Sequence, residues 1–232
     1  MSDVTIAAKD RGNFAGYLAR PASGTGAGVL VIQEIFGVNQ VMREICDDWA
    51  RAGYFALCPD LFWRQQPGIQ LTDQTDAEWQ RAFQLYKGFD EAKGVEDLIQ
   101  SLQHLRKVPG CNGRVGSVGY CLGGKLAYLM ATRSDADCNV GYYGVTIEIA
   151  LSEAKNISKP LMLHIAEKDQ FCPPENQAKI KQGLSLSRLT TIHSYPGVDH
   201  AFARIGGAHY DGDAANLANG RTEAFFKSYL QR

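Results

Sequence analysis

The sequence of 232 residues lacks a long apolar run: no stretch approaches the ~20 residues that a membrane-spanning helix needs. It also lacks a charge imbalance, since 24 Lys and Arg residues stand against 25 Asp and Glu residues. A formal net charge of -1 gives no electrostatic reason to bind nucleic acid or an anionic membrane. The first residues carry an early acid, Asp3, and no apolar core stretch, so we expect no signal peptide.

The chain also lacks a C-x-x-C pair, the spacing typical of zinc sites and redox disulfides. Its six cysteines are spread over the whole length, which favours reduced thiols in a cytoplasmic protein. We expect no metal ion and a monomer. Apart from Cys121, the cysteines are expected to be packing residues, namely Cys46, Cys58, Cys111, Cys138 and Cys172.

Short apolar strands alternate with helical patterns along the chain. We expect a hairpin over residues 4–20 with its turn at 11–13, followed by strands at 29–32, 54–59, 114–118, 138–142, 159–166 and 189–195. Helices are expected over 38–52, from Thr72 or Asp73 to about 88, and over 90–107, 124–131, 174–184 and 214–230. This alternation predicts one α/β domain, residues 1–232, built as a three-layer αβα sandwich with a mostly parallel sheet.

Apolar spacing also predicts which helix faces are buried. Three sets of residues are expected to pack: Val41, Ile45, Trp49 and Ala52; Val95, Leu98, Ile99, Leu102 and Leu105; and Leu217, Phe225, Phe226 and Tyr229.

The stretch Gly119-Tyr120-Cys121-Leu122-Gly123 lies between a predicted strand and a predicted helix. It matches the G-x-S-x-G nucleophile elbow, with Cys121 where serine usually stands. Glycines flank such a turn because a Cβ there would clash with the strand or the helix. The N-terminus of the following helix favours the thiolate form of the cysteine. An ordinary βα turn with a buried cysteine remains the alternative.

Three chemistry-bearing residues follow predicted strands in the order Cys121, Asp169, His200. Nucleophile, acid, histidine is the chain order of α/β-hydrolases. In such sheets, ligands bind beyond the carboxyl ends of the strands. His200 can accept the thiol proton, and Asp169 can hold the imidazole in the required tautomer. Cys121, Asp169 and His200 are therefore the predicted catalytic triad.

Other residues compete for these roles. His209 also follows the last strand and is the main rival of His200, whereas His164 lies in an apolar strand and is expected to be a hydrogen-bonded core residue. Asp199 competes with Asp169, but its place beside His200 favours loop hydrogen bonding. Glu34 also ends a strand, and either a solvated loop carboxylate or a site residue fits that position.

Several motifs together resemble the dienelactone hydrolase (carboxymethylenebutenolidase) family over nearly the full chain. They are Gln33-Glu34-Ile35-Phe36-Gly37-Val38-Asn39, Cys58-Pro59-Asp60-Leu61, Gly119-Tyr120-Cys121-Leu122-Gly123-Gly124, Gly141-Tyr142-Tyr143-Gly144 and His200-Ala201-Phe202-Ala203-Arg204. The resemblance implies an α/β-hydrolase fold and a cofactor-free Cys-His-Asp triad. It also implies that the enzyme opens the lactone ring of dienelactone to give maleylacetate in chlorocatechol breakdown.

The same resemblance implies roles for further residues. Glu34 would help to form the thiolate, and the backbone N–H groups of Ile35 and Leu122 would form the oxyanion hole. The expected substrate-binding residues are Arg204, which would pair with the substrate carboxylate, together with Phe36, Tyr143 and Arg81.

The chain departs from the family pattern at a few positions. Ala201 follows the histidine where serine is frequent, and Phe83 stands where tyrosine is common. Trp79 aligns with a second substrate-binding arginine, and Arg81 lies two residues further on, roughly on the opposite helix face. These changes leave the triad intact but leave open a related esterase or lactonase with another small carboxylated substrate. A binding or sensor module on a hydrolase scaffold and a thiol redox protein centred on Cys121, with Cys172 as a resolving thiol, are the alternatives from other classes.

Overall fold

A computed structural model describes residues 2–231. The chain divides after Val115 into two compact units, residues 1–115 and residues 116–232. The first unit contains four strands in the order β1-β2-β4-β3, namely β1 (Ser2–Ala7), β2 (Asn13–Ala19), β3 (Gly26–Ile32) and β4 (Phe55–Pro59). The β1–β2 and β2–β4 pairs are antiparallel, and β3 pairs with β4 in parallel.

The predicted hairpin is confirmed, but its turn begins already at Ala8, because Asn13 pairs with Ala7.

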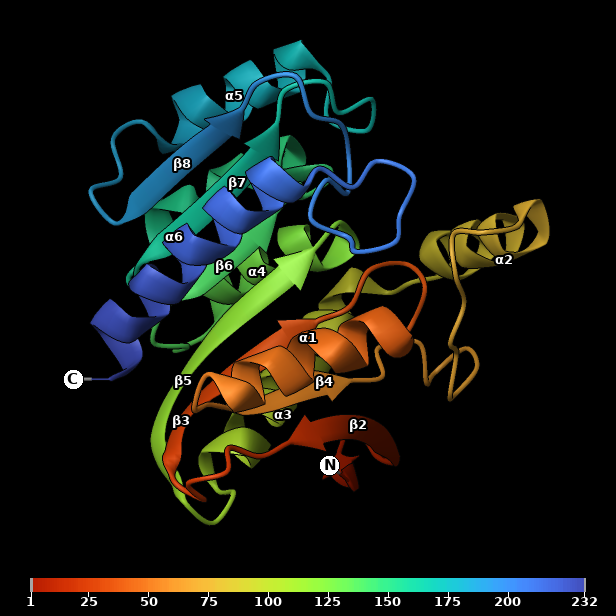
Figure 1. Ribbon diagram of the computed structural model, residues 1–232, viewed down its shortest axis with the longest axis vertical. Coiled ribbons are helices and arrows are strands. Elements are labelled where there is room, and N and C mark those ends of the chain that lie inside the picture. Colours follow the sequence, from red (N-terminus) through yellow and green to blue (C-terminus); the bar gives the residue numbers. More distant parts are fainter. Residues whose placement is uncertain (1, 232) are drawn as a thin grey trace. The chain divides into compact units, whose positions relative to one another are not determined.

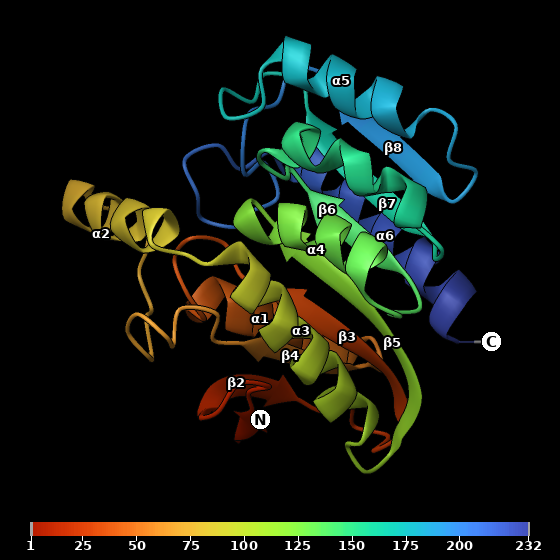
Figure 2. The same ribbon diagram turned by 180° about the vertical axis from the view of Figure 1, so that it is seen from behind.

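Helices cover both faces of these strands. Helix α1 (Gln40–Arg51) lies on one face, and helix α3 (Glu91–Arg106) lies on the other (Figures 1 and 2). The fully buried stripe of α1 consists of Met42, Cys46 and Ala50.

The predicted packing face of α1 is therefore displaced by one residue. Val41, Ile45 and Trp49 are half-buried, and Ala52 is exposed beyond the last helical turn. Neighbouring stripes of one helix differ by only 100° in direction, and spacing alone does not separate them when both carry apolar residues.

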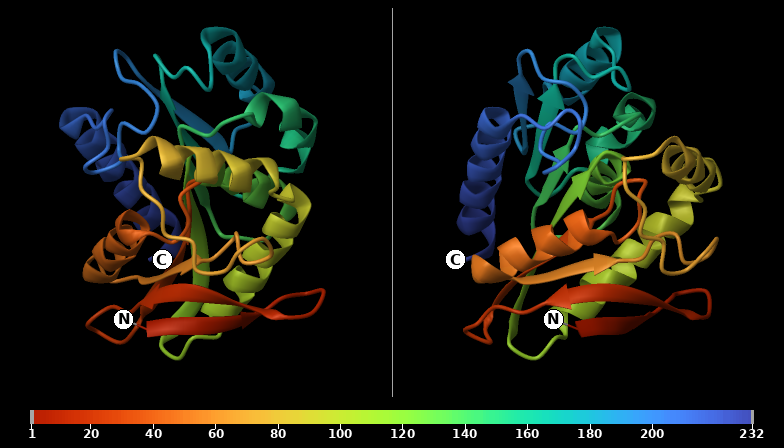
Figure 3. Two further views of the ribbon diagram at one scale, coloured as in Figure 1. Left: turned by 90° about the vertical axis from the view of Figure 1, so that its right-hand side faces the viewer. Right: turned by 45° about the vertical axis from the view of Figure 1, so that its right-hand side comes forward.

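Helix α2 (Asp76–Lys87) stands clear of the strands of this unit and leads into α3 (Figure 3). Its N-cap is Thr75, whose hydroxyl accepts the N–H of Glu78, and neither Thr72 nor Asp73 caps it as predicted. Thr72 instead binds the side chain of Glu78 through its own N–H and hydroxyl, at 2.8 Å and 2.7 Å.

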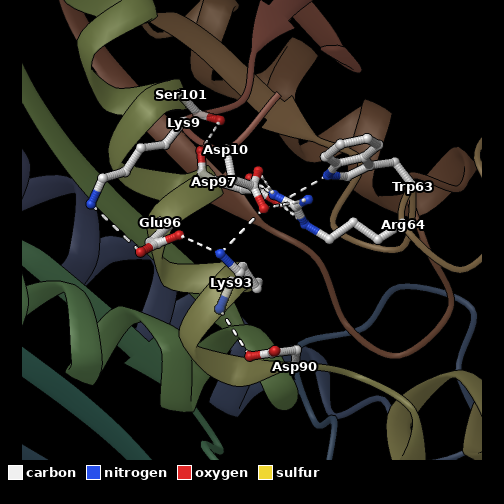
Figure 4. A network of polar contacts seen from close by, with 9 residues as sticks. All are labelled: Lys9, Asp10, Trp63, Arg64, Asp90, Lys93, Glu96, Asp97 and Ser101. Carbon is white, nitrogen blue, oxygen red and sulfur yellow. Dashed lines mark hydrogen bonds and ion pairs between the residues drawn. The ribbon is translucent and has the colours of Figure 1, made fainter. Parts of the chain in front are cut away.

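A buried carboxylate that the apolar pattern does not reveal anchors α3. Asp97 accepts hydrogen bonds from the Trp63 indole and from Arg64, each at 2.8 Å, and Arg64 also binds Asp10 in the β1–β2 turn (Figure 4). Burial raises the pKa of the Asp97 carboxyl, and these two donors oppose the rise. Ile99, predicted to be buried on this helix, is half-buried instead. The network holds the loop after β4 and the β1–β2 turn against α3.

In the second unit, strands β5 (Cys111–Tyr120), β6 (Asn139–Tyr142), β7 (Leu161–Ala166) and β8 (Thr190–Tyr195) are parallel and adjacent in that order. Strand β5 begins before the boundary, and its residues 117–120 pair with β6. Helices α4 (Leu122–Arg133) and α5 (Pro174–Leu184) cover one face, and α6 (Gly212–Leu230) covers the other (Figures 1 and 2). A 3₁₀ segment, η1 (Ile147–Asn156), follows β6.

The buried face of α6 differs from the predicted one. Phe226 is buried as expected and Phe225 is half-buried, but Leu217 is 51% exposed and Tyr229 is also exposed. Ala215, Ala218, Thr222 and Leu230 lie on the inner face with Phe226, and Thr222 hydrogen bonds to the buried His164 at 2.9 Å. Hydrophobicity alone does not single out a face built on such contacts.

The predicted fold class is confirmed. Each unit has strands with helices on both faces, and most strand pairs are parallel. Within residues 2–231, no helix combines the length and apolar character that crossing a bilayer demands.

Candidate catalytic site

Cys121 occupies the sharp turn between β5 and α4. Its backbone has φ 56° and ψ -114°, an uncommon conformation for a residue with a side chain. The N–H of Cys121 donates to the carbonyl of Tyr142 at 3.1 Å, which ties the turn to the end of β6. Strain of this kind persists only where the surroundings impose it, and it is frequent at functional sites.

The glycines around the turn permit close approach of the backbone. A Cβ at Gly119 would overlap the carbonyl oxygen of Gly123, in the first turn of α4. A Cβ at Gly124 would overlap the carbonyl oxygen of Tyr142 and lie 2.8 Å from the Cα of Gly144. The strand, the helix and the end of β6 therefore meet at distances that only glycine allows.

The three predicted triad residues come together in the second unit. His200 Nδ1 lies 2.7 Å from Asp169 Oδ2, and both side chains are buried. The imidazole is also hydrogen bonded to the Cys121 side chain. Because Nδ1 is hydrogen bonded to Asp169, Nε2 is the ring nitrogen that remains for the contact with the Cys121 sulfur. The order and spacing of these residues in the sequence thus correspond to one chain of polar contacts.

Two residues that the sequence analysis did not consider hold the acid in place. The backbone N–H of Phe171 donates to Asp169 Oδ1 at 2.8 Å. The buried side-chain amide of Gln177, on α5, donates to the carbonyls of Cys172 at 2.8 Å and Ala166 at 3.1 Å. These bonds fix the turn after β7 on both sides of Asp169. No local sequence signal marks either residue.

The rings of Tyr143 and Phe171 pack against the imidazole of His200. The ring of Tyr143 meets His200 edge-on at a centroid distance of 5.1 Å, and the ring of Phe171 does so at 4.9 Å. Tyr143 has φ 37°, and its N–H donates to the carbonyl of His164 at 2.7 Å. The end of the buried strand β6 thus places Tyr143, a predicted binding residue, beside the predicted triad.

The charge state of His200 follows from its neighbours. Burial acts to lower the pKa of His200, but the electrostatic interaction with Cys121 and the hydrogen bonds to Asp169 and Cys121 outweigh it and raise the pKa to about 10. His164 shows the opposite behaviour, because burial without an acidic partner lowers its pKa to about 3. At neutral pH the site therefore holds an imidazolium at His200, and the core holds a neutral imidazole at His164.

This contrast gives a prediction for NMR titration of the folded protein. The ring resonances of His200 are expected to change only as the pH rises through about 10, where its proton is lost. Those of His164 are expected to stay constant between about pH 5 and pH 8, because this ring takes up a proton only near pH 3. In the variant Cys121→Ala the interaction of His200 with the sulfur is gone, and the His200 transition should move to lower pH. A wild-type His200 that titrates below neutral pH would contradict the assigned ion pair.

The competing residues occupy other positions. His209 Nδ1 lies 3.1 Å from Asp199 Oδ2 on the surface, so these two rivals pair with each other. Asp199 also accepts the N–H of His200 at 2.6 Å, the loop hydrogen bonding expected of it. His164 is buried and hydrogen bonded at both ring nitrogens, as predicted.

The remaining predicted residues divide between the two units. Leu122, the first residue of α4, and the buried Arg204 belong to the second unit. Glu34, Ile35 and Phe36 form a buried segment of the first unit that follows β3. The carbonyl of Glu34 accepts the amide of Gln33 at 3.2 Å, and Gln33 also accepts the N–H of Leu61 at 3.0 Å.

Arg81 and Trp79 have different surroundings in the first unit. The guanidinium of Arg81 hydrogen bonds to Gln66 and Gln84. The ring of Trp79 packs edge-on against Phe36 at 5.0 Å, and its indole N–H donates to the carbonyl of Asp73. Over residues 2–231, we find no group of three His, Cys, Asp or Glu side chains placed to bind a metal ion.

Comparison with known proteins identifies relatives over the whole chain. The model of the "Dienelactone hydrolase family" matches residues 14–230. A protein of Azospirillum brasilense named "Putative carboxymethylenebutenolidase" is 52% identical over 234 residues, which cover 99% of this chain and 100% of that protein. "Carboxymethylenebutenolidase 1" of Cupriavidus pinatubonensis is 39% identical over 219 residues, 94% of this chain and 93% of the relative.

A solved structure shares the fold. The crystal structure of a "Putative Dienelactone Hydrolase" from Klebsiella pneumoniae superposes with a TM-score of 0.88 and 26% sequence identity. The alignment covers 98% of each chain.

Proposed function

Because the chain belongs to the dienelactone hydrolase family, we propose that it opens the lactone ring of dienelactone to give maleylacetate, with Cys121, His200 and Asp169 as its catalytic triad. Membership of this family makes the chain a carboxylic ester hydrolase. The observation that carries the triad is the continuous polar contact from the Asp169 carboxylate through His200 to the Cys121 thiol.

The reaction proceeds in two halves. The Cys121 thiolate attacks the lactone carbonyl carbon and forms a tetrahedral intermediate, which collapses to a thioester as the ring C–O bond breaks. The proton on His200 Nε2 passes to the departing enolate oxygen. The neutral imidazole then removes a proton from water, and the hydroxide attacks the thioester. Collapse of this second intermediate releases the carboxylic acid and restores the Cys121 thiolate beside the protonated His200. An enolate is a good leaving group, which suits a thiol nucleophile.

Three further groups complete the proposed machinery. The N–H of Leu122 is in the first turn of α4, where backbone donors lack a partner within the helix. We propose that this N–H and the N–H of Ile35 form the oxyanion hole. Removing one such donor typically lowers the rate by about 10²–10³-fold. Glu34 is proposed to promote formation of the thiolate when substrate binds.

The proposed substrate carries a carboxylate, and Arg204 is its proposed partner. Replacing Arg204 with alanine is expected to lower kcat/KM for cis- and trans-dienelactone by about 10- to 100-fold, the equivalent of about 1.5–3 kcal/mol of charge-assisted hydrogen bonding. Hydrolysis of p-nitrophenyl acetate, which lacks a carboxylate, should change little.

The exposed Arg188 provides the matched control, and Arg188→Ala should leave both activities unchanged. Circular dichroism and thermal melting of Arg204→Ala and Arg204→Lys separate a folding defect from a binding defect. Equal losses on both substrates by a folded Arg204→Ala variant would remove this role. A wild-type enzyme that hydrolyses the acetate but not dienelactone would overturn the proposed substrate.

The surroundings of Arg81 and Trp79 favour a second candidate, a related thiol esterase with another small carboxylated substrate. Trp79 stands where the family has a second substrate-binding arginine, and its ring packs on Phe36. Arg81 is hydrogen bonded to two glutamine side chains. In this candidate the triad is unchanged and only the substrate differs. For either substrate we propose a cytoplasmic, monomeric, single-domain enzyme without a cofactor.

A further inference from the structure

Phe171 differs from Tyr143, which also packs against His200, because its ring is open to solvent. Phe171 is 40% exposed, whereas Tyr143 is 1% exposed. A single exposed apolar side chain is common on protein surfaces, so exposure by itself has no functional meaning. Two further observations give this ring a role.

The first observation is that the backbone of Phe171 is held in place. Its N–H is bound by the carboxylate of Asp169, and the next residue, Cys172, is bound by the amide of Gln177. The N–H of Cys172 also donates to the carbonyl of Asp169 at 3.3 Å. The ring therefore projects from a turn whose position is set before substrate arrives, as a preorganised binding surface requires.

The second observation is the distance between this ring and the group that transfers the proton. The ring centroids of Phe171 and His200 are 4.9 Å apart, and the planes make an angle of 72°. A general acid must come within about 3 Å of the oxygen that it protonates. The atoms attached to the leaving oxygen are therefore close to the imidazole, against which Phe171 and Tyr143 pack. Of these two rings, Phe171 is the one with free surface.

We propose that Phe171 is a specificity-determining residue that packs against the leaving group of the substrate. The ring offers a flat apolar surface and no hydrogen-bonding atom, so it favours esters and lactones whose leaving oxygen is bonded to a flat unsaturated carbon, as in phenols and enols. This inference rests on the proposed function, because it assigns the leaving group to the His200 side of the thioester.

The test compares acetate esters that differ only in the leaving group. Relative to wild type, Phe171→Ala is expected to lower kcat/KM for phenyl acetate by about tenfold, the upper end of an aromatic contact, and to change kcat/KM for trifluoroethyl acetate by less than about twofold. Phe171→Leu keeps apolar bulk but loses the flat ring. Its kcat/KM for phenyl acetate should lie between that of wild type and that of Phe171→Ala. The pH profile should stay unchanged, because the residue at position 171 keeps the N–H that binds Asp169 in both variants.

Tyr229, an aromatic residue in the last turn of α6 with 36% exposure, is the matched control. Tyr229→Ala should alter neither ester. Equal losses on the two esters, or a shifted pH profile, would mean that the Phe171 ring only shields His200, and would overturn the proposal, as would unchanged activity on both. Failure of the proposed function is distinguishable, because it would appear as wild-type turnover of both esters by Cys121→Ala.

Discussion

Replacing Cys121 with alanine is expected to lower kcat for lactone and ester hydrolysis by about 10⁴-fold or more, because the variant has no atom that can form the thioester. The other two residues of the proposed triad keep their contact, since His200 and Asp169 bind each other without the sulfur. The side chain at position 121 is small and lies at a turn, so folding should be little affected. Steady-state kinetics on dienelactone and on p-nitrophenyl acetate, with circular dichroism as the folding check, measures the effect.

A cysteine outside the site provides the matched control. Cys111 is half-buried at the start of β5, and Cys111→Ala should retain wild-type turnover. If Cys121→Ala also retained it, the nucleophile would have to be sought elsewhere. An equal loss in both variants would point to a general effect of removing a cysteine and would not support the assignment.

The second large effect is expected on stability. Gly119→Ala places a methyl group on the carbonyl oxygen of Gly123. The backbone fixes the positions of both the Cβ and the carbonyl, so neither can rotate away. Relief of the overlap requires separation of β5 from the first turn of α4, and we expect a cost of about 3 kcal/mol or more in the free energy of unfolding. Denaturant unfolding monitored by circular dichroism measures this value.

Gly220 makes the comparison specific. It lies within α6, and a Cβ added there would meet no atom within 4 Å. Gly220→Ala should therefore stabilise the protein by about 0.5–1 kcal/mol, since alanine is the better helix former. A Gly119→Ala variant as stable as wild type would show that the turn around Cys121 is looser than this geometry requires.

The elbow was predictable from the sequence because everything that creates it is local. A strand, a glycine-flanked cysteine and a helix are adjacent in the chain, and the order of Cys121, Asp169 and His200 then restricts the fold. The contacts around Asp169 were not predictable in the same way. Phe171 and Gln177 act through a backbone N–H and a side-chain amide, groups that many residues could supply.

The buried helix faces show a different limit. In α1 two neighbouring stripes are apolar, and the one with Met42 and Cys46 is buried more deeply than the one with Val41 and Ile45. In α6 the polar Thr222 is buried while Leu217 is exposed, because His164 provides a hydrogen-bond partner. Burial of a polar group depends on partners distant in the sequence, and spacing carries no information about them.

Direct detection of the acyl-enzyme tests the central claim. Wild-type protein mixed with p-nitrophenyl acetate, quenched in acid within the first turnovers and digested, should yield a peptide that carries one acetyl group on the sulfur of residue 121. Mass spectrometry should find this thioester in wild type and in Cys111→Ala. Turnover at the wild-type rate with the acetyl group on another residue, or with no covalent adduct at any time, would contradict the mechanism.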